Sequence, residues 1–217
     1  MTPAAAPGEA RVRAFFTRSG GGYRFARWGR PQVPAIFGAA PEAERALTEA
    51  LRAVAALSPH GVAAEDRELG ANALVFLAER WADLREVRGL PRLVPDLDRL
   101  ADVLGATGAN QYRIFDFDGR GAIRLCITLL CVDDDLARLP LPALALSQAA
   151  MGMLLWSDRA FLSESPVALL EGGRVILRPE IAAVLRAAYD PELPDASLDP
   201  AHAAALAARI GAEGEGP

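Results

Sequence analysis

Lysine is absent from this chain, and all 23 of its basic side chains are arginine. The glycine-rich segment at residues 19–30 therefore lacks the Lys-Ser/Thr pair of a phosphate-binding loop. Alanine, leucine and arginine dominate the composition, so we attribute the missing lysine to GC-rich codon usage and draw no functional conclusion from it. The net charge is −5, and this acidic balance argues against a general nucleic-acid-binding protein.

Cysteine and histidine are scarce, with two of each. Cys126 and Cys131 fall in one expected strand, five residues apart, so their side chains point to opposite faces. At roughly 3.3 Å per residue their Cα atoms lie about 16 Å apart, which is too far for a disulfide. We therefore expect two small buried thiols and a reducing compartment. The histidines, His60 and His202, do not lie near the expected helix at 144–158, which has the residue spacing of a zinc-binding helix.

Long apolar runs are missing as well. The most apolar stretch, residues 141–156, contains Pro142, Ser147 and Gln148. It falls short of the roughly 18 apolar residues that a membrane span requires. The first residues have no basic segment followed by an apolar core, so they do not predict a secretory signal. We expect a cytoplasmic protein without a membrane span.

What the sequence does contain is the patterning of a globular domain. The hydrophobic share is 52% and the charged share 24%, and 217 residues suit one domain. The clearest element is a helix at residues 41–58, with Pro41 in its first turn and Leu47 and Leu51 on one face. Further helices are expected at 95–106, 144–158, 179–190 and 199–211. Strands are expected at 10–16, 23–28, 32–39 and 71–78, followed by a hairpin over 110–132 with its turn near Asp118-Gly119.

Strands and helices do not alternate regularly in this order, which favours an α+β fold over a parallel doubly wound sheet. We expect a single domain with a twisted, largely antiparallel sheet, packed helices and a helical C-terminal lobe. This domain is expected to span residues 23–211, between a flexible N-terminal arm at 1–22 and a disordered tail at 212–217. Pro34 predicts that its strand lies at a sheet edge. The stretch after residue 157 is expected to be mostly irregular.

The expected helix at 144–158 has the spacing of a zinc-peptidase helix without its ligands. Such helices place two histidines one turn apart on one face, with a glutamate as the general base. If Gly152 is the glycine that follows the second histidine, the ligand positions fall on Ala145 and Ala149 and the base on Leu146. None of these side chains binds zinc or accepts a proton. We therefore expect no metal, no cofactor and no catalytic residue on this helix.

Motifs around this helix carry a resemblance to a known family. They are Gln148, Gly152-Met153, Ser157-Asp158, Ala160-Phe161 and the segment LRPEIAAVLRAAYDPELP at 177–194. In these motifs and in its order of elements, the chain resembles a family of bacterial proteins with a degenerate zincin-like helix and no assigned activity. The resemblance covers residues 23–210 in order and is specific over 144–194. It implies a zincin-like α+β fold without metal ligands.

Two other segments suggest binding chemistry. Segment 19–30 brings Arg24, Arg27 and Arg30 together with Trp28, a set that can hold a phosphate or stack on a base. Arginines alternating on the outer face of an edge strand are the simpler interpretation. The second segment is a run of three carboxylates, either a solvated turn that starts a helix or a site for a divalent cation. Its residues are Asp133, Asp134 and Asp135.

The leading hypothesis is a non-catalytic zincin-like domain that acts as a protein-interaction or accessory module, with a protein as its partner. Two alternatives stay open. One is a small-molecule or anion-binding protein that uses Arg24, Arg27 and Arg30. The other is a metal-dependent hydrolase that uses Asp133 and Asp135. The lack of a convergent catalytic set favours a protein that is not an enzyme.

Overall fold

Residues 7–214 are described in the computed structural model of this chain. A four-stranded sheet lies at its centre, in the order β2-β3-β5-β4. β3 pairs in parallel with both β2 and β5, whereas β4 pairs antiparallel with β5. These strands are β2 (Pro34–Phe37), β3 (Ala73–Ala78), β4 (Gln111–Phe117) and β5 (Ile123–Cys131). β2 is an edge strand, as Pro34 predicts.

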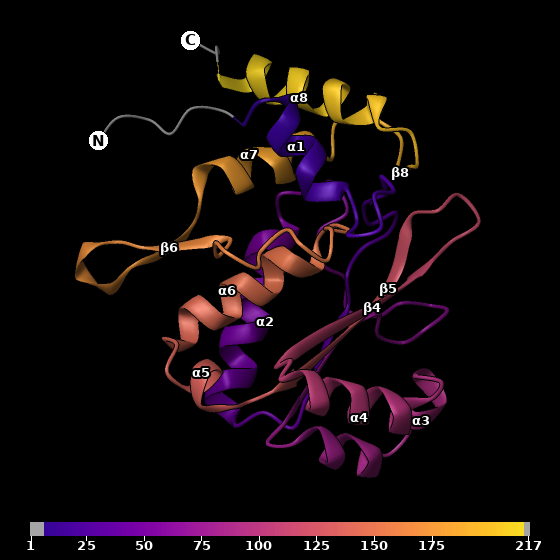
Figure 1. Ribbon diagram of the computed structural model, residues 1–217, viewed down its shortest axis with the longest axis vertical. Helices are drawn as coiled ribbons and strands as arrows, with labels where there is room; N and C mark the ends of the chain where they lie inside the picture. Colours follow the sequence, from indigo (N-terminus) through magenta and orange to yellow (C-terminus); the bar gives the residue numbers. More distant parts are fainter. Residues whose placement is uncertain (1–6, 215–217) are drawn as a thin grey trace.

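Each face of the central sheet is covered by its own set of helices (Figure 1). On one face, alternate residues of β3 and β5 such as Val75 and Cys126 join a core with α2 (Pro41–Ala55) and α6 (Leu141–Gly152). On the other face, residues such as Phe76 and Leu129 join a second core. That core is closed by η1 (Trp81–Glu86), α3 (Leu90–Leu93) and α4 (Leu97–Thr107). The expected helices at 41–58 and 95–106 and the hairpin at 110–132 are confirmed.

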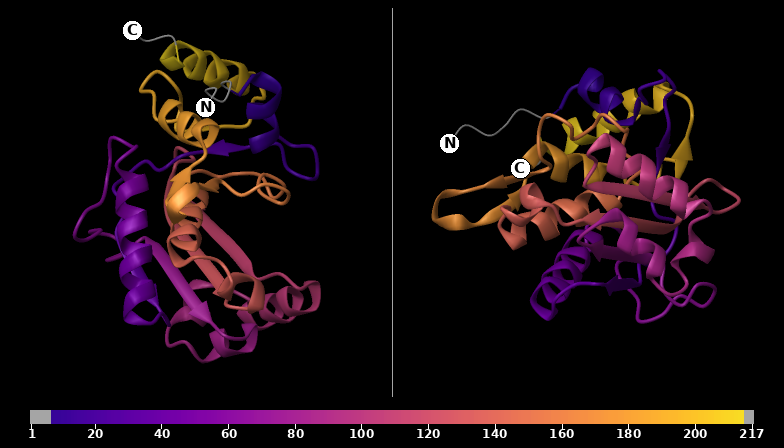
Figure 2. Two further views of the ribbon diagram at one scale, coloured as in Figure 1. Left: turned by 90° about the vertical axis from the view of Figure 1, so that its left-hand side faces the viewer. Right: turned by 60° about the horizontal axis from the view of Figure 1, so that its bottom comes forward.

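The first and last parts of the chain form a helical lobe at one end of the sheet (Figure 2). In this lobe α1 packs against α8, and α7 packs against α8. Two short strands, β1 and β8, pair antiparallel beside them. The elements are α1 (Glu9–Phe16), β1 (Phe25–Ala26), α7 (Pro179–Ala187), β8 (Ala196–Ser197) and α8 (Ala201–Gly214). The core on the α6 side of the sheet continues into this lobe without a break.

Between α6 and the lobe, a hairpin projects from the body of the molecule (Figures 1 and 2). It consists of β6 (Val167–Leu169) and β7 (Val175–Leu177), joined through η2 (Glu171–Gly173). Gly172 and Gly173 both have positive φ angles in its turn. The expectation of a mostly irregular segment after residue 157 is therefore wrong over this hairpin. A further short helix, α5 (Asp134–Ala137), follows β5.

The α+β class is confirmed, but three details of the expected architecture are wrong. The central sheet is mixed, because the connections through α2 and through α4 and β4 return the chain to parallel positions beside β3. The predicted arm and strand near the N-terminus are a packed helix instead, with Val12, Phe15 and Phe16 buried at helical spacing. The predicted tail continues α8 to Gly214, while residues 1–6 and 215–217 lie outside the described part.

Within residues 7–214, no helix is both long enough and apolar enough to cross a membrane.

Candidate functional site

The arginines of segment 19–30 do not form one site. Arg27 points inward and closes the junction to the helical lobe. Its Nε donates to Asp195 Oδ1 at 2.9 Å, and its two terminal nitrogens donate to three backbone carbonyls. These carbonyls belong to Ala188, Asp190 and Leu193. With a carboxylate and three carbonyls as partners, Arg27 holds the lobe together and has little capacity left for a ligand.

Arg30 and Trp28 also have structural partners. Arg30 lies within ion-pair distance of Asp66 and Glu68, at 3.4 and 3.0 Å. Trp28 is buried, and its indole N–H donates to Gly152 O at 2.9 Å. The interpretation of alternating arginines on an outer face is thus wrong, because the strand is only two residues long and Arg27 is buried.

The acidic run serves as the start of α5. Asp133 accepts the backbone N–H of Leu136 at 2.9 Å and the side-chain amide of Asn110 at 3.1 Å, and these bonds lower its pKa. Asp134 and Asp135 are exposed and lie near Arg138. Among the described residues, no group of three or more histidines, cysteines or carboxylates is arranged to hold a metal ion. The geometry matches the helix-start interpretation.

The degenerate helix positions lie in and beside the packed core. Ala145 and Ala149 are each 1% exposed and belong to the core between α6 and the sheet. Leu146 packs against the same core, and Gly152 accepts the bond from Trp28. At the two ligand positions the helix presents no side chain to a substrate.

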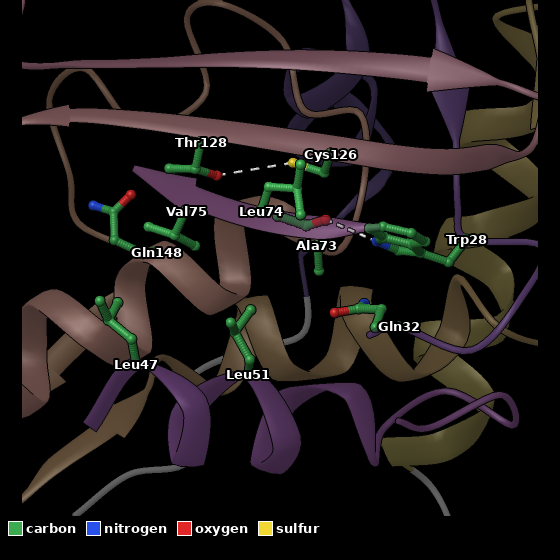
Figure 3. Close-up of a pocket in the computed structure, with 11 residues that line it drawn as sticks. Trp28, Gln32, Leu47, Leu51, Ala73, Leu74, Val75, Cys126, Thr128 and Gln148 are labelled. Carbon is green, nitrogen blue, oxygen red and sulfur yellow. Dashed lines mark hydrogen bonds between the residues drawn. The ribbon is translucent and has the colours of Figure 1, made fainter. Parts of the chain in front are cut away.

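Next to this helix, a small cavity of about 10 Å³ lies between α2, α6 and the sheet (Figure 3). It has room for one water molecule at most. Cys126 lines it, 3.8 Å from the hydroxyl of Thr128, and burial raises the pKa of this thiol to about 11. A buried thiol with a raised pKa is a poor nucleophile, so this cavity supports no catalytic function.

A second and larger hollow, half open to solvent, lies beside β4 and has a volume of about 620 Å³. Its walls are β4, the chain after α6 and the connection between α1 and β1. We call it the β4 hollow. It is lined by Arg18, Arg24, Gln111, Tyr112, Arg113, Ile114, Phe115, Phe117, Met151, Leu155, Trp156, Ser157, Asp158, Phe161 and Leu162. Its volume is in the range of small-molecule and peptide sites.

Arg113 is the central cation of the β4 hollow. Its guanidinium contacts the side-chain oxygens of Gln148 and Gln111, and its buried Nε has no hydrogen-bond partner. No carboxylate in residues 7–214 forms an ion pair with it. Burial without a neighbouring anion lowers the pKa of Arg113 to about 10. A half-buried cation whose contacts are neutral amides has lost part of its hydration without gaining an opposite charge.

Two more arginines stand at the mouth of the hollow. The Arg24 guanidinium lies 4.6 Å from the centre of the Phe117 ring. Partial burial and the nearby Arg24 charge lower the pKa of Arg18, against the opposing effect of Asp158. Neither arginine forms an ion pair within the described residues. The hollow is thus lined by three cations and one carboxylate, Asp158. This carboxylate already accepts the backbone N–H of Ser19 at 3.0 Å.

Several apolar and aromatic side chains around the hollow are exposed or only partly buried. β4 has the sequence QYRIFDF, yet none of its seven residues is fully buried. At the rim, Tyr112 is 40% exposed and Leu162 is 79% exposed. Apolar residues that gather around a set of unpaired cations are typical of a binding surface.

The remaining titratable groups form no catalytic set. His202 is buried and its Nδ1 lies 2.8 Å from the Tyr23 hydroxyl, inside the lobe. Burial lowers its pKa to about 4. His60 lies on a loop, where desolvation lowers its pKa. In the described part of the chain, no serine or cysteine is hydrogen-bonded to either histidine.

No protein-family model, curated protein or solved structure matches this chain in the comparisons made. The resemblance to a zincin-like family therefore stays a prediction.

Of the residues predicted to bind a ligand, the structure brings only Arg24 to the hollow. Arg18 and Arg113 were missed. A signal was present for Arg113, which lies among aromatic and apolar residues in an expected strand, where a cation needs a partner. What places it beside Arg24 is the tertiary fold, because the two residues are far apart in sequence.

Proposed function

We propose that this chain is a non-catalytic binding module and that its β4 hollow binds an acidic ligand. The observation that carries the proposal is Arg113, a desolvated guanidinium whose contacts are neutral amides. A carboxylate or phosphate at this place forms charge-assisted hydrogen bonds with its remaining donors and compensates for the lost hydration. Arg18 and Arg24 add two further cations at the mouth.

Shape and polarity restrict the ligand further. Phe115, Phe117 and Trp156 line the same hollow and add apolar surface next to the cations. A ligand that carries both acidic and apolar groups therefore fits better than a bare inorganic anion. This proposal keeps the anion-binding alternative but assigns it to Arg18, Arg24 and Arg113, since Arg27 and Arg30 already have partners.

Two observations favour binding over catalysis. The positions that correspond to zinc ligands, Ala145 and Ala149, are buried alanines. The carboxylates proposed for a hydrolase, Asp133 and Asp135, serve as a helix cap and as a partner of Arg138. A role as an interaction module, with a protein partner that presents the acidic ligand, agrees with both.

The test is a binding titration with two acidic probes, a fluorescein-labelled hexaglutamate peptide followed by anisotropy and citrate as a competitor. We expect the double variant Arg18→Glu/Arg24→Glu to bind the peptide at least about tenfold more weakly than the parent chain. The matched control is Arg45→Glu/Arg99→Glu, which makes the same change in net charge at exposed positions outside the hollow. The control should bind within about twofold of the parent.

Two outcomes overturn the proposal. One is that neither probe binds. The other is that both double variants weaken binding equally, since overall charge rather than the hollow then attracts the probes.

A further inference from the structure

Within residues 7–214, the main chain of β4 has one edge without a strand partner. Cys131 N–H donates to Asn110 O at 2.9 Å, which makes these two residues a hydrogen-bonded pair. Cys126 N–H points the other way, to Asn72 O at 2.8 Å. Since hydrogen-bonded pairs alternate along an antiparallel ladder, residues 112, 114 and 116 bond to β5. Residues 111, 113 and 115 therefore direct their N–H and C=O groups away from the sheet.

This open edge has a defined length. The β4–β5 register shifts between Asp116 and Phe117, and the Phe117 N–H is taken by the Asp116 carboxylate at 2.9 Å. The β4–β5 pairing continues at Phe117 with Ile123, but a bulge whose N–H is taken by a side chain interrupts the strand edge at that point. The open stretch therefore runs from Gln111 to Phe115, enough for a short added strand.

The hollow lies along this same edge. Its lining includes the five consecutive residues from Gln111 to Phe115. Consecutive strand residues point to opposite faces, so a hollow that touches all five reaches the strand edge and not one face alone. A strand placed here meets Arg113 and Phe115 on the α6 side and the exposed Tyr112 ring on the other.

We propose that the acidic ligand is an extended peptide segment of a partner protein, which adds to β4 as a fifth strand of the central sheet. This inference rests on the proposed function. Main-chain bonds to residues 111, 113 and 115 provide the affinity, and alternate side chains provide the selectivity. On the hollow side, the segment places a carboxylate next to Arg113 and an apolar side chain next to Phe115.

The positive charge of Arg113 favours an acidic peptide over a second copy of this chain as the added strand. Two β4 edges that pair antiparallel about a two-fold axis at residue 113 place the two Arg113 side chains directly opposite each other, and an axis at residue 114 makes them diagonal neighbours on the same face. Each is already desolvated and has no anion nearby, so such pairing adds like-charge repulsion. An acidic strand has the opposite effect, because it supplies the missing counter-charge.

The experiment uses an acetylated, amidated heptapeptide with glutamate at its second and sixth positions, leucine at its fourth and threonine at the others. Binding is measured for this probe and for versions N-methylated either at the even or at the odd positions. N-methylation removes a main-chain donor and leaves every charge in place. Strand addition predicts that one set loses at least about tenfold in affinity while the other stays within about threefold, because only alternate N–H groups face β4.

Amide hydrogen exchange supplies a second readout on the intact chain. In the free protein, the amides of residues 111, 113 and 115 should exchange faster than those of 112 and 114. The parent heptapeptide should slow the first set. Equal effects of both N-methylated sets, together with no change in exchange at 111, 113 and 115, overturn the strand inference.

Failure of this inference is distinct from failure of the proposed function. If hexaglutamate and citrate bind through Arg18 and Arg24 but the N-methylated sets behave alike, the hollow takes acids without strand addition. If the chain dimerises and the peptide fails to compete, the occupant is a second copy. If none of the acidic probes binds, both the function and the inference are wrong.

Discussion

Arg27 and Arg113 lie in similar local sequences but have opposite surroundings. Each lies in a short extended segment beside aromatic residues, and each is largely withdrawn from water. Arg27 meets a carboxylate and three carbonyls, whereas Arg113 meets two amide side chains and keeps an unpaired Nε. The contrast separates a cation that stabilises the fold from one that the fold leaves available for a ligand.

The largest expected effect tests the first half of this contrast. Arg27→Ala removes the buried donor from Asp195 Oδ1 and from the carbonyls of Ala188 and Leu193, while the Asp190 carbonyl keeps only the Leu193 N–H. We expect the free energy of unfolding to fall by about 3 to 5 kcal/mol, measured by urea denaturation. The matched control is Arg120→Ala, which removes an exposed partner of the same carboxylate and should cost about 0.5 kcal/mol or less. A loss below about 1 kcal/mol for Arg27→Ala contradicts its structural role.

The lobe also contains a buried atom that has no hydrogen-bond partner among the described residues, His202 Nε2, and this histidine predicts a pH dependence of stability. Burial lowers the pKa of His202 from 6.5 to about 4, so the folded state favours the neutral ring. The stability is fully present above pH 6.5 and is lost as the pH falls towards 4, by up to about 3 kcal/mol. His202→Gln should flatten the stability profile between these pH values. An unchanged slope in the variant, relative to the parent, counts against this prediction.

Arg113→Met sharpens the contrast with Arg27. Removing a desolvated cation that has no anion nearby should leave the free energy of unfolding within about 1 kcal/mol of the parent, or raise it. The same variant should lose binding of the hexaglutamate probe. Urea denaturation and anisotropy on one protein preparation provide both values. A destabilisation as large as that of Arg27→Ala shows instead that Arg113 is a structural residue.

The smallest effects are expected at the acidic run. Asp133→Ala removes the cap of α5 and should cost about 1 kcal/mol. Asp134→Ala/Asp135→Ala removes exposed contacts to Arg138 and should change stability by about 0.5 kcal/mol or less. Thermal unfolding with and without Mg²⁺ or Mn²⁺ checks the hydrolase alternative. A metal-dependent rise in the melting temperature that disappears in Asp133→Ala favours that alternative.

Local sequence patterns predicted the helices and strands better than they predicted which of these elements pack together. Pro41 and the apolar face of α2, the Asp118-Gly119 turn and the edge position of Pro34 all follow from short-range rules. Two misses had a visible signal. Val12, Phe15 and Phe16 stand at helical spacing, and the Gly172-Gly173 pair separates two apolar runs as a hairpin turn does.

The parallel pairings of the central sheet and the position of the site could not be predicted locally, because both depend on segments that are far apart in the sequence. β3 and β5 are nearly continuous apolar runs, as buried parallel strands are, but nothing local shows that β5 returns beside β3. That pairing leaves β4 at the edge and puts Arg113 beside the hollow. Arg24 and Arg113 share this hollow because β1 and β4 approach it from different parts of the chain. No pattern within either segment indicates that Arg24 and Arg113 lie in the same hollow.

The way the lobe is assembled has a consequence for synthesis on the ribosome. Helix α1 and strand β1 are made well before their partners, α8 and β8. Phe16 can meet Phe25 soon after both are made, but Phe15 and Phe16 also pack on Trp156, and the α8 surface beside α1 is made later still. Until α8 has been made, the nascent chain leaves part of the apolar face of α1 uncovered, and an uncovered apolar face is a surface that chaperones bind.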